Sequence, residues 1–162
     1  MCGYVGFINN KNLLKDKKHI IYKMMNRIKH RGPDGEGTYI DDNIAIGFKR
    51  LSIIGLNDGC QPIYNEDRNL VLVFNGEIYN YRELKQKLIE KGHKFYTHSD
   101  SEVLIHLYES YKEKMLNYLR GMFSFCIWDK KQEILFLARD FFGIKPLYYG
   151  KINNTFFFWL RN

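Results

Sequence analysis

The stretch Leu70-Val-Leu-Val-Phe-Asn-Gly-Glu-Ile-Tyr-Asn80 decides the fold class. Its first five residues are all apolar, so a strand here must be covered on both faces. A second segment of this kind lies at Ile134–Ala138. Helical and extended patterns do not alternate strictly along the chain, which disfavours a doubly wound parallel sheet. Two stacked sheets with helices on the outside would cover such strands.

The remaining elements follow from periodicity and from turn residues. Helices are expected near residues 16–28, 81–91 and 100–112, with a helical turn at 114–120. Extended segments are expected at 4–8, 38–40, 43–49, 70–74, 123–129, 134–139, 147–150 and 155–160. Residues 31–37 hold three glycines and a proline, which predicts a loop. Capping boxes are predicted for the second and third helices, Asn80 with Glu83 and Ser99 with Glu102. No repeat or linker is found, so residues 1–162 are interpreted as one domain.

Composition excludes several classes of protein. The chain has 162 residues, 45% of them hydrophobic and 27% charged, which is ordinary for a folded globular protein and not for a disordered one. Its longest apolar runs have five residues, whereas a membrane-spanning helix needs about 20. No basic stretch followed by an apolar segment marks a secretory signal, so a cytoplasmic location is expected. The net charge of +7 is mostly scattered lysine, so neither a nucleic-acid nor a membrane partner is predicted.

The three cysteines, Cys2, Cys60 and Cys126, are widely separated. They form no C-x-x-C pair and have no histidine at ligand spacing, so neither a disulfide framework nor a metal site is expected. Cys126 lies in the apolar segment Phe123–Trp128 and is interpreted as a small buried side chain. Cys60, in a turn, offers no chemistry by itself.

Cys2 differs because of its position. Removal of an initiator Met before a small residue would leave Cys2 with its thiol beside its own α-amine. The amine titrates near 7.7–8.0 and a free thiol near 8.5, so near neutral pH the amine can accept the thiol proton at little cost. Taken alone, the Met-Cys pair is more often accidental than functional.

Two further groups of residues have both a chemical and a plain structural interpretation. The Asn75 amide and the Gly76 N–H could stabilise an oxyanion during acyl transfer, or they could simply form a strand-to-helix turn. Arg50 could bind a carboxylate and Asp100 an ammonium group, as an amino-acid substrate requires. Taken singly, each is more often a surface charge, and Asp100 also suits the first turn of a helix.

Together these residues resemble the N-terminal glutaminase domain of glutamine-hydrolysing asparagine synthetases, which are class II glutamine amidotransferases. The resemblance extends to about Phe158. It rests on eight motifs in order: Met1-Cys-Gly3, Arg31-Gly-Pro-Asp34, Arg50-Leu-Ser-Ile-Ile54, Gln61-Pro62, Asn75-Gly-Glu-Ile-Tyr-Asn80, Ser99-Asp-Ser-Glu102, Gly121-Met-Phe123, and Arg139-Asp140 with Gly143-Ile-Lys-Pro-Leu-Tyr-Tyr149.

The resemblance implies an α+β N-terminal-nucleophile hydrolase fold, a four-layer αββα sandwich of two stacked, mainly antiparallel sheets. It implies that Cys2 attacks the side-chain amide of L-glutamine, with Asn75 and Gly76 as the oxyanion hole and Arg50 on the α-carboxylate. The other glutamine-binding positions implied are Leu51, Ser52, Ile53, Ile54, Asn75, Gly76, Glu77 and Asp100. The Arg31–Asp34 loop lies close to the pocket in the family and is assigned no catalytic role.

The chain also departs from the family pattern. Gly55 stands where relatives commonly have Asp, and after Phe158 the family sequence continues with elements that are absent here, so the domain is interpreted as truncated. The resemblance implies that glutamine hydrolysis needs no cofactor. No Ser-Gly-Gly-x-Asp-Ser pyrophosphatase loop is present, so ATP and Mg are expected only in the absent synthetase domain. A synthetase domain or subunit that accepts ammonia is the expected partner. The alternative is an idle remnant, or a partner-binding module, of an asparagine-synthetase-like protein.

Overall fold

The computed structural model describes residues 2–9, 16–51 and 60–160, which fall into two compact units. The first unit holds the described residues up to 51, residues 60–62, and residues 146–160, and the second holds residues 63–145. Every strand pair in the described residues is antiparallel. The predicted α+β class, with two antiparallel sheets and three α-helices, is confirmed. None of the helices in the described residues is both long and apolar enough to cross a membrane.

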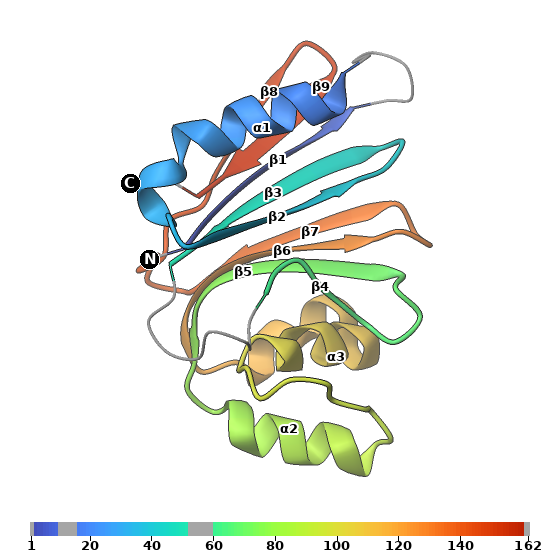
Figure 1. The fold of residues 1–162 in the computed structure, drawn as a ribbon. Coiled ribbons are helices and arrows are strands. Elements are labelled where there is room, and N and C mark those ends of the chain that lie inside the picture. The colour runs from blue at the N-terminus through green and yellow to red at the C-terminus, as the bar shows by residue number, and fades with distance from the viewer. Residues whose placement is uncertain (1, 10–15, 52–59, 161–162) are drawn as a thin grey trace. The chain divides into compact units, whose positions relative to one another are not determined.

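The first unit is a five-stranded sheet with the order β2-β3-β1-β9-β8 (Figure 1). Its elements are β1 Gly3–Asn9, α1 Lys17–Arg27, the 3-10 helix η1 Lys29–Arg31, β2 Gly35–Ile40, β3 Ile44–Arg50, β8 Tyr148–Ile152 and β9 Thr155–Trp159. Helix α1 begins after Asp16, whose side chain accepts the backbone N–H of His19 at 2.9 Å. The loop predicted at residues 31–37 is wrong in its second half, because β2 already begins at Gly35. Gly37 of β2 allows the backbone of residue 61 to approach this strand closely, since a Cβ at position 37 would lie 1.9 Å from the Gln61 carbonyl oxygen.

Helix α1 packs on one face of this sheet (Figure 1). Its buried residues Ile21 and Met25 join a core that contains Phe7 of β1 and Ala45 of β3. Gly47 of β3 allows the close approach, because a Cβ there would lie 2.4 Å from Cγ of Met25. The apolar residues at helical spacing in the sequence, Ile20, Ile21, Met24, Met25 and Ile28, therefore mark the buried face of α1.

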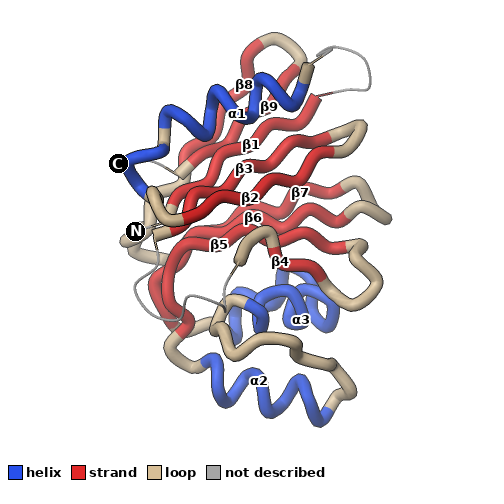
Figure 2. Tube along the Cα trace, viewed as in Figure 1, coloured by secondary structure: helices blue, strands red, loops and turns tan. Residues whose placement is uncertain are grey.

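The second unit is a four-stranded sheet with the order β4-β5-β6-β7, accompanied by α2 and α3 (Figure 2). Its elements are β4 Ile63–Tyr64, β5 Leu70–Ile78, α2 Tyr81–Glu90, α3 Glu102–Tyr111, the 3-10 helix η2 Lys112–Tyr118, β6 Gly121–Asp129 and β7 Ile134–Arg139. The apolar segment Leu70–Phe74 is buried throughout, as predicted. The same prediction is wrong for Ile134–Ala138, because β7 is an edge strand and Ile134 is 45% exposed.

Both predicted capping boxes are wrong. Asn80 precedes α2 but does not cap it, because its amide donates to the Tyr118 carbonyl at 2.9 Å and accepts the Arg120 N–H at 3.0 Å. Glu102 begins α3, yet its carboxylate accepts the N–H groups of Tyr96 and Thr97, each at 2.7 Å. Asn80 therefore joins its helix to the segment before β6, and Glu102 joins its helix to the connection before it, so neither side chain closes its own helix.

Candidate functional site

Cys2 lies directly before β1 in the first unit, and its thiol contacts the backbone of Leu51. The Leu51 N–H donates to the Cys2 sulfur at 3.4 Å, and the sulfur lies 3.7 Å from the Leu51 carbonyl oxygen. The thiol is half-buried and no disulfide involves it. These two contacts fix the position of the sulfur beside the end of β3.

Arg31 holds the backbone of Cys2 in place. Its Nε donates to the Cys2 carbonyl oxygen at 3.1 Å, and only 7% of its surface is exposed. Burial lowers the pKa of the Arg31 guanidinium, an effect that the neighbouring Cys2 partly opposes. Gly3 lies against the same side chain, because a Cβ there would be 3.1 Å from Arg31 Cδ. Arg31 is therefore a positioning residue that sequence reasoning had given no role.

The loop after Arg31 also contacts the end of β3. A Cβ on Gly32 would lie 2.4 Å from the Lys49 carbonyl carbon and 2.5 Å from the Arg50 nitrogen, so only glycine fits. The Asp34 N–H donates to the Arg50 carbonyl oxygen at 3.0 Å. Arg50 and Leu51 are thus held beside Cys2 by one short loop.

Arg50 ends β3 and is half-buried, with its Nη1 3.8 Å from the sulfur of the exposed Cys60. Leu51 follows directly and supplies the N–H described above. The other predicted members of this segment, Ser52, Ile53 and Ile54, lie outside the described residues. The first unit therefore brings Cys2, Arg50 and Leu51 together.

In the second unit, Asn75 and Gly76 lie inside β5, which runs on to Ile78 and does not stop at Phe74. The strand-to-helix turn considered for these residues is therefore wrong. Asn75 is 5% exposed, and its Nδ2 has no hydrogen-bond partner among the described residues. A buried amide without an acceptor costs about 1–3 kcal/mol, so it is a donor prepared for a bound group.

Gly76 is required by the packing of β5 against β6. A Cβ at this position would lie 2.1 Å from the Met122 carbonyl oxygen and 2.7 Å from Phe123 Cα. Gly121, on the partner strand, is equally close to the Glu77 carbonyl oxygen, at 2.1 Å. Glycine on both strands lets the end of this ladder form without a clash.

Asp100 is tied to the same strand end. Its Oδ2 accepts the Ile78 N–H at 2.8 Å, which places it beside the half-exposed segment Gly76–Glu77. Burial raises the pKa of Asp100, the Ile78 hydrogen bond opposes this, and the charge of Glu77 adds to it. Two carboxylates that repel each other are suited to a cationic group. The second unit therefore brings Asn75, Gly76, Glu77 and Asp100 together.

Comparison with known proteins extends over almost the whole chain. The family described as "Glutamine amidotransferase domain" matches residues 1–159. Asparagine synthetase [glutamine-hydrolyzing] 1 of Bacillus subtilis (strain 168) is 49% identical over 98% of this chain and 25% of its own length. Asparagine synthetase [glutamine-hydrolyzing] of Zea mays is 43% identical over 93% of this chain and 25% of its own length.

A similar solved structure is the glutamine phosphoribosylpyrophosphate amidotransferase of B. subtilis. It superposes with a TM-score of 0.79 and 25% identity over 98% of this chain and 41% of that protein. The chain spans about a quarter of the length of the curated relatives it matches.

Proposed function

The chain belongs to the glutamine amidotransferase domain family, of the asparagine synthetase type, and we propose that it hydrolyses L-glutamine to glutamate and ammonia with Cys2 as nucleophile. The observation that carries the proposal is the buried Asn75 Nδ2, a donor without an acceptor in the described residues. An amide hydrolase needs such a donor for the oxyanion that forms during attack.

We propose the following course of reaction. After removal of Met1, the α-amine of Cys2 takes the thiol proton, and the thiolate attacks the side-chain carbonyl carbon of glutamine. Asn75 and the Gly76 N–H stabilise the oxyanion. The C–N bond breaks as the amine returns the proton to nitrogen, so ammonia leaves and a thioester forms. Water then attacks the thioester, giving glutamate and the free thiol.

We propose that charge complementarity selects the substrate. Arg50 pairs with the α-carboxylate, and Asp100 with Glu77 receives the α-ammonium group, while Leu51, Ser52, Ile53 and Ile54 line the site. The raised pKa of Asp100 supports this role, because a bound ammonium group would offset the cost of ionising it.

We propose that the ammonia passes to a synthetase domain or chain, in which ATP and Mg would serve the amidation step. An exposed apolar loop in the second unit supports a partner, since Phe141 is 94% exposed and Phe142 83%. A single domain over residues 1–162 and a cytoplasmic location stay predictions.

The test is covalent labelling with a diazo-ketone analogue of glutamine, followed by peptide mass mapping. We expect one label on Cys2, an intact mass without Met1, and steady glutamate production. Cys60→Ser should label normally and Cys2→Ser should not. An unmodified Cys2, or no glutamate, would overturn the proposal and favour the idle or partner-binding module.

A further inference from the structure

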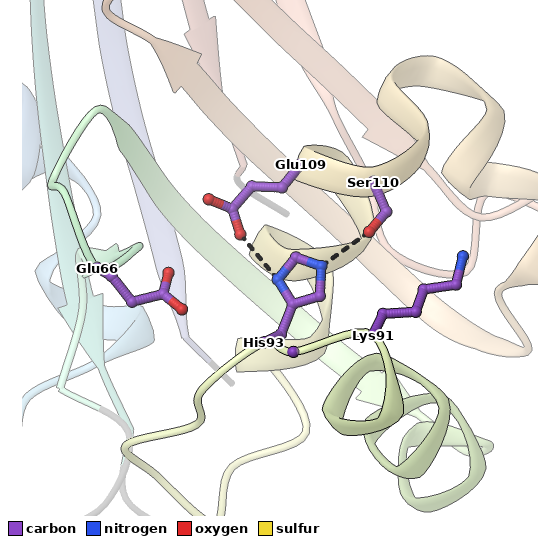
Figure 3. A pocket seen from close by; sticks show the side chains of 6 residues that line it. Glu66, Lys91, His93, Glu109 and Ser110 are labelled. Atoms are coloured by element: carbon purple, nitrogen blue, oxygen red, sulfur yellow. Dashed lines mark hydrogen bonds and ion pairs between the residues drawn. The ribbon is translucent and has the colours of Figure 1, made fainter.

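Two histidines and two glutamates that the proposed hydrolysis does not use converge in the second unit. Nδ1 of His93 and Nδ1 of His106 lie 3.2 Å and 3.0 Å from the same atom, Oε2 of Glu109. Oε2 of Glu66 lies 3.9 Å from Nδ1 of His106. Figure 3 shows Glu109 turned toward the ring of His93, with Glu66 on the same side of the ring and Ser110 on the opposite side. We call these four residues the His-Glu cluster.

The spacing in the His-Glu cluster suits one small cation. One ligand atom each from Glu66, His93 and His106 lies within 4.8 Å of the other two. Zinc binds imidazole nitrogen at about 2.0–2.1 Å and carboxylate oxygen at about 2.0–2.2 Å, so ligand atoms around a tetrahedral ion are about 3.3 Å apart. The observed separations of 3.0, 3.2 and 3.9 Å are therefore within a small side-chain adjustment of that geometry.

On the outer side of the cluster, the Nε2 atom of His93 has a hydrogen-bond partner, and that of His106 has a carboxylate near it but, among the described residues, no partner within hydrogen-bond distance. Nε2 of His93 lies 2.8 Å from the Ser110 hydroxyl, and Nε2 of the buried His106 lies 3.6 Å from Oε1 of Glu102. With hydrogen on each Nε2, both Nδ1 atoms would offer lone pairs to the centre. A carboxylate behind a ligating histidine commonly fixes the tautomer in this way.

Glu109 is oriented by a different contact. Asn65 Nδ2 donates to Oε1 of Glu109 at 2.7 Å, so that Oε2 faces both histidines. The nearby cation Lys91 is engaged elsewhere, because its amino group lies 2.5 Å from the Tyr111 hydroxyl, and Figure 3 shows this group pointing away from His93. The charges around the centre are thus predominantly negative.

An ion could reach the cluster from solvent. An open depression of about 340 Å³ is lined by Glu66, Lys91, Gly92, His93, Glu109 and Ser110. The side chains of His93, Glu109 and Glu66 are 17%, 24% and 34% exposed. Of the four residues, only His106 is fully buried, since 1% of its side-chain surface is exposed.

We propose that Glu66, His93, His106 and Glu109 bind one divalent cation of the zinc type. The ligands come from the turn after β4, the connection between α2 and α3, and α3 itself, so the ion would fasten three segments of the second unit to one another. Imidazole with carboxylate ligands suits zinc and its transition-metal neighbours better than magnesium or calcium. The role is structural, since four protein ligands leave no open position for substrate.

Without the ion, the cluster is an ion-pair network. Burial lowers the pKa of His106, but the nearby carboxylates of Glu102 and Glu109 outweigh burial and raise that pKa to about 9. Zinc therefore competes with a proton for this nitrogen, as it does at most histidine sites. A direct measurement of zinc binding distinguishes bound zinc from a bound proton.

The experiment is a calorimetric titration of zinc into the full chain carrying Cys2→Ser and Cys60→Ser, which removes the accessible thiols as competing ligands. We expect one ion per chain and a rise in unfolding temperature. His93→Gln should weaken binding by at least about tenfold, the lower end of what even an outer-sphere substitution costs. His98→Gln, an exposed histidine in the same connection, is the matched control and should bind like the parent.

Cobalt(II) in place of zinc gives a second measurement that does not depend on the stability of any variant. We expect tetrahedral d–d absorption in the parent and its loss in His93→Gln and in Glu66→Gln. No stoichiometric zinc binding, or equal affinity in the parent and His93→Gln, would overturn the proposal. Neither measurement uses glutamine, so the result is independent of the proposed hydrolysis.

Discussion

Asn75 has a buried hydrogen-bond donor that a bound ligand could satisfy. Its amide N–H group is buried and lacks an acceptor in the described residues, while its backbone belongs to the β5–β6 ladder opposite Ser124. Asn75→Ala should therefore keep the strand and remove the unpartnered donor, together with the amide oxygen. We expect kcat to fall by about 10²–10³-fold, the usual cost of one oxyanion donor, with little change in KM. Steady-state glutamate release measures both, and a fall of less than about threefold would contradict the assignment.

Under the proposed hydrolysis, Arg31 is a positioning residue that holds the backbone of Cys2. Arg31→Met keeps much of the apolar side chain but loses the Nε donor to the Cys2 carbonyl oxygen. We expect kcat to fall by about tenfold or more, because a displaced nucleophile can cost up to about 100-fold, while KM changes little. The rate of Cys2 alkylation by the glutamine analogue should fall in parallel. A fall in thermal stability alone, with normal alkylation of the folded protein, would show that Arg31 is merely structural.

The turn between β7 and β8 begins with Asp140, whose carboxylate organises it. Oδ2 accepts the N–H groups of Phe123 and Lys145 at 3.2 Å and 2.9 Å, and Oδ1 accepts the Ile144 N–H at 2.9 Å. Burial raises the pKa of Asp140, but these hydrogen bonds outweigh it, so the net pKa is lowered. The ionised form is therefore favoured in the folded state.

The lowered pKa of Asp140 determines how the stability of the fold depends on pH. Because the folded pKa lies below the unfolded value of about 3.9, Asp140 stabilises the fold fully above that value, and this stability is lost as pH falls through the folded pKa. We expect Asp140→Asn to lose about 1–3 kcal/mol of unfolding free energy at pH 7 and to show a shallower decline below pH 4. Urea unfolding between pH 7 and pH 2.5 measures both. Parallel pH profiles for the two proteins would contradict this account.

Helix α1 depends on Gly47 of β3 for its close packing. Gly47→Ala places a Cβ 2.4 Å from Cγ and 2.6 Å from Sδ of the buried Met25. We expect a loss of about 1–3 kcal/mol of unfolding free energy, the usual cost of overpacking a filled core. Gly150→Ala is the control, because nothing lies within 4 Å of the added Cβ. Equal stability of the two variants in denaturant unfolding would show that Met25 simply moves aside.

At the scale of elements, local patterns predicted most strands and helices, since alternation and helical periodicity are properties of neighbouring residues. The capping boxes failed because Asn80 and Glu102 hydrogen-bond to segments that are not their own helices. β7 was expected to be covered on both faces, but edge position depends on strand order, which composition does not reveal.

At the scale of the whole molecule, contacts between distant residues explain what the sequence could and could not predict. Motif resemblance pointed to Cys2, Asn75 and Asp100, whereas the link from Arg31 to Cys2 spans 29 residues and left no local signal. The His-Glu cluster gathers residues from positions 66 to 109, and only His106 and Glu109 are at helical spacing. A search for cysteine-based ligand patterns therefore missed it.

If a separate synthetase domain or chain carries out the amidation, the chain should release both products of glutamine hydrolysis, glutamate and ammonia. No Ser-Gly-Gly-x-Asp-Ser pyrophosphatase loop occurs in the sequence, and under the proposal the ammonia is accepted by a synthetase domain or chain. With glutamine, aspartate, ATP and Mg, we expect glutamate and free ammonia in equal amounts and no asparagine, measured by amino-acid chromatography and an ammonia assay. Cys2→Ser should make neither product. Asparagine formation by the parent would show that the amidation step resides in these residues, against the proposal that a synthetase partner carries it.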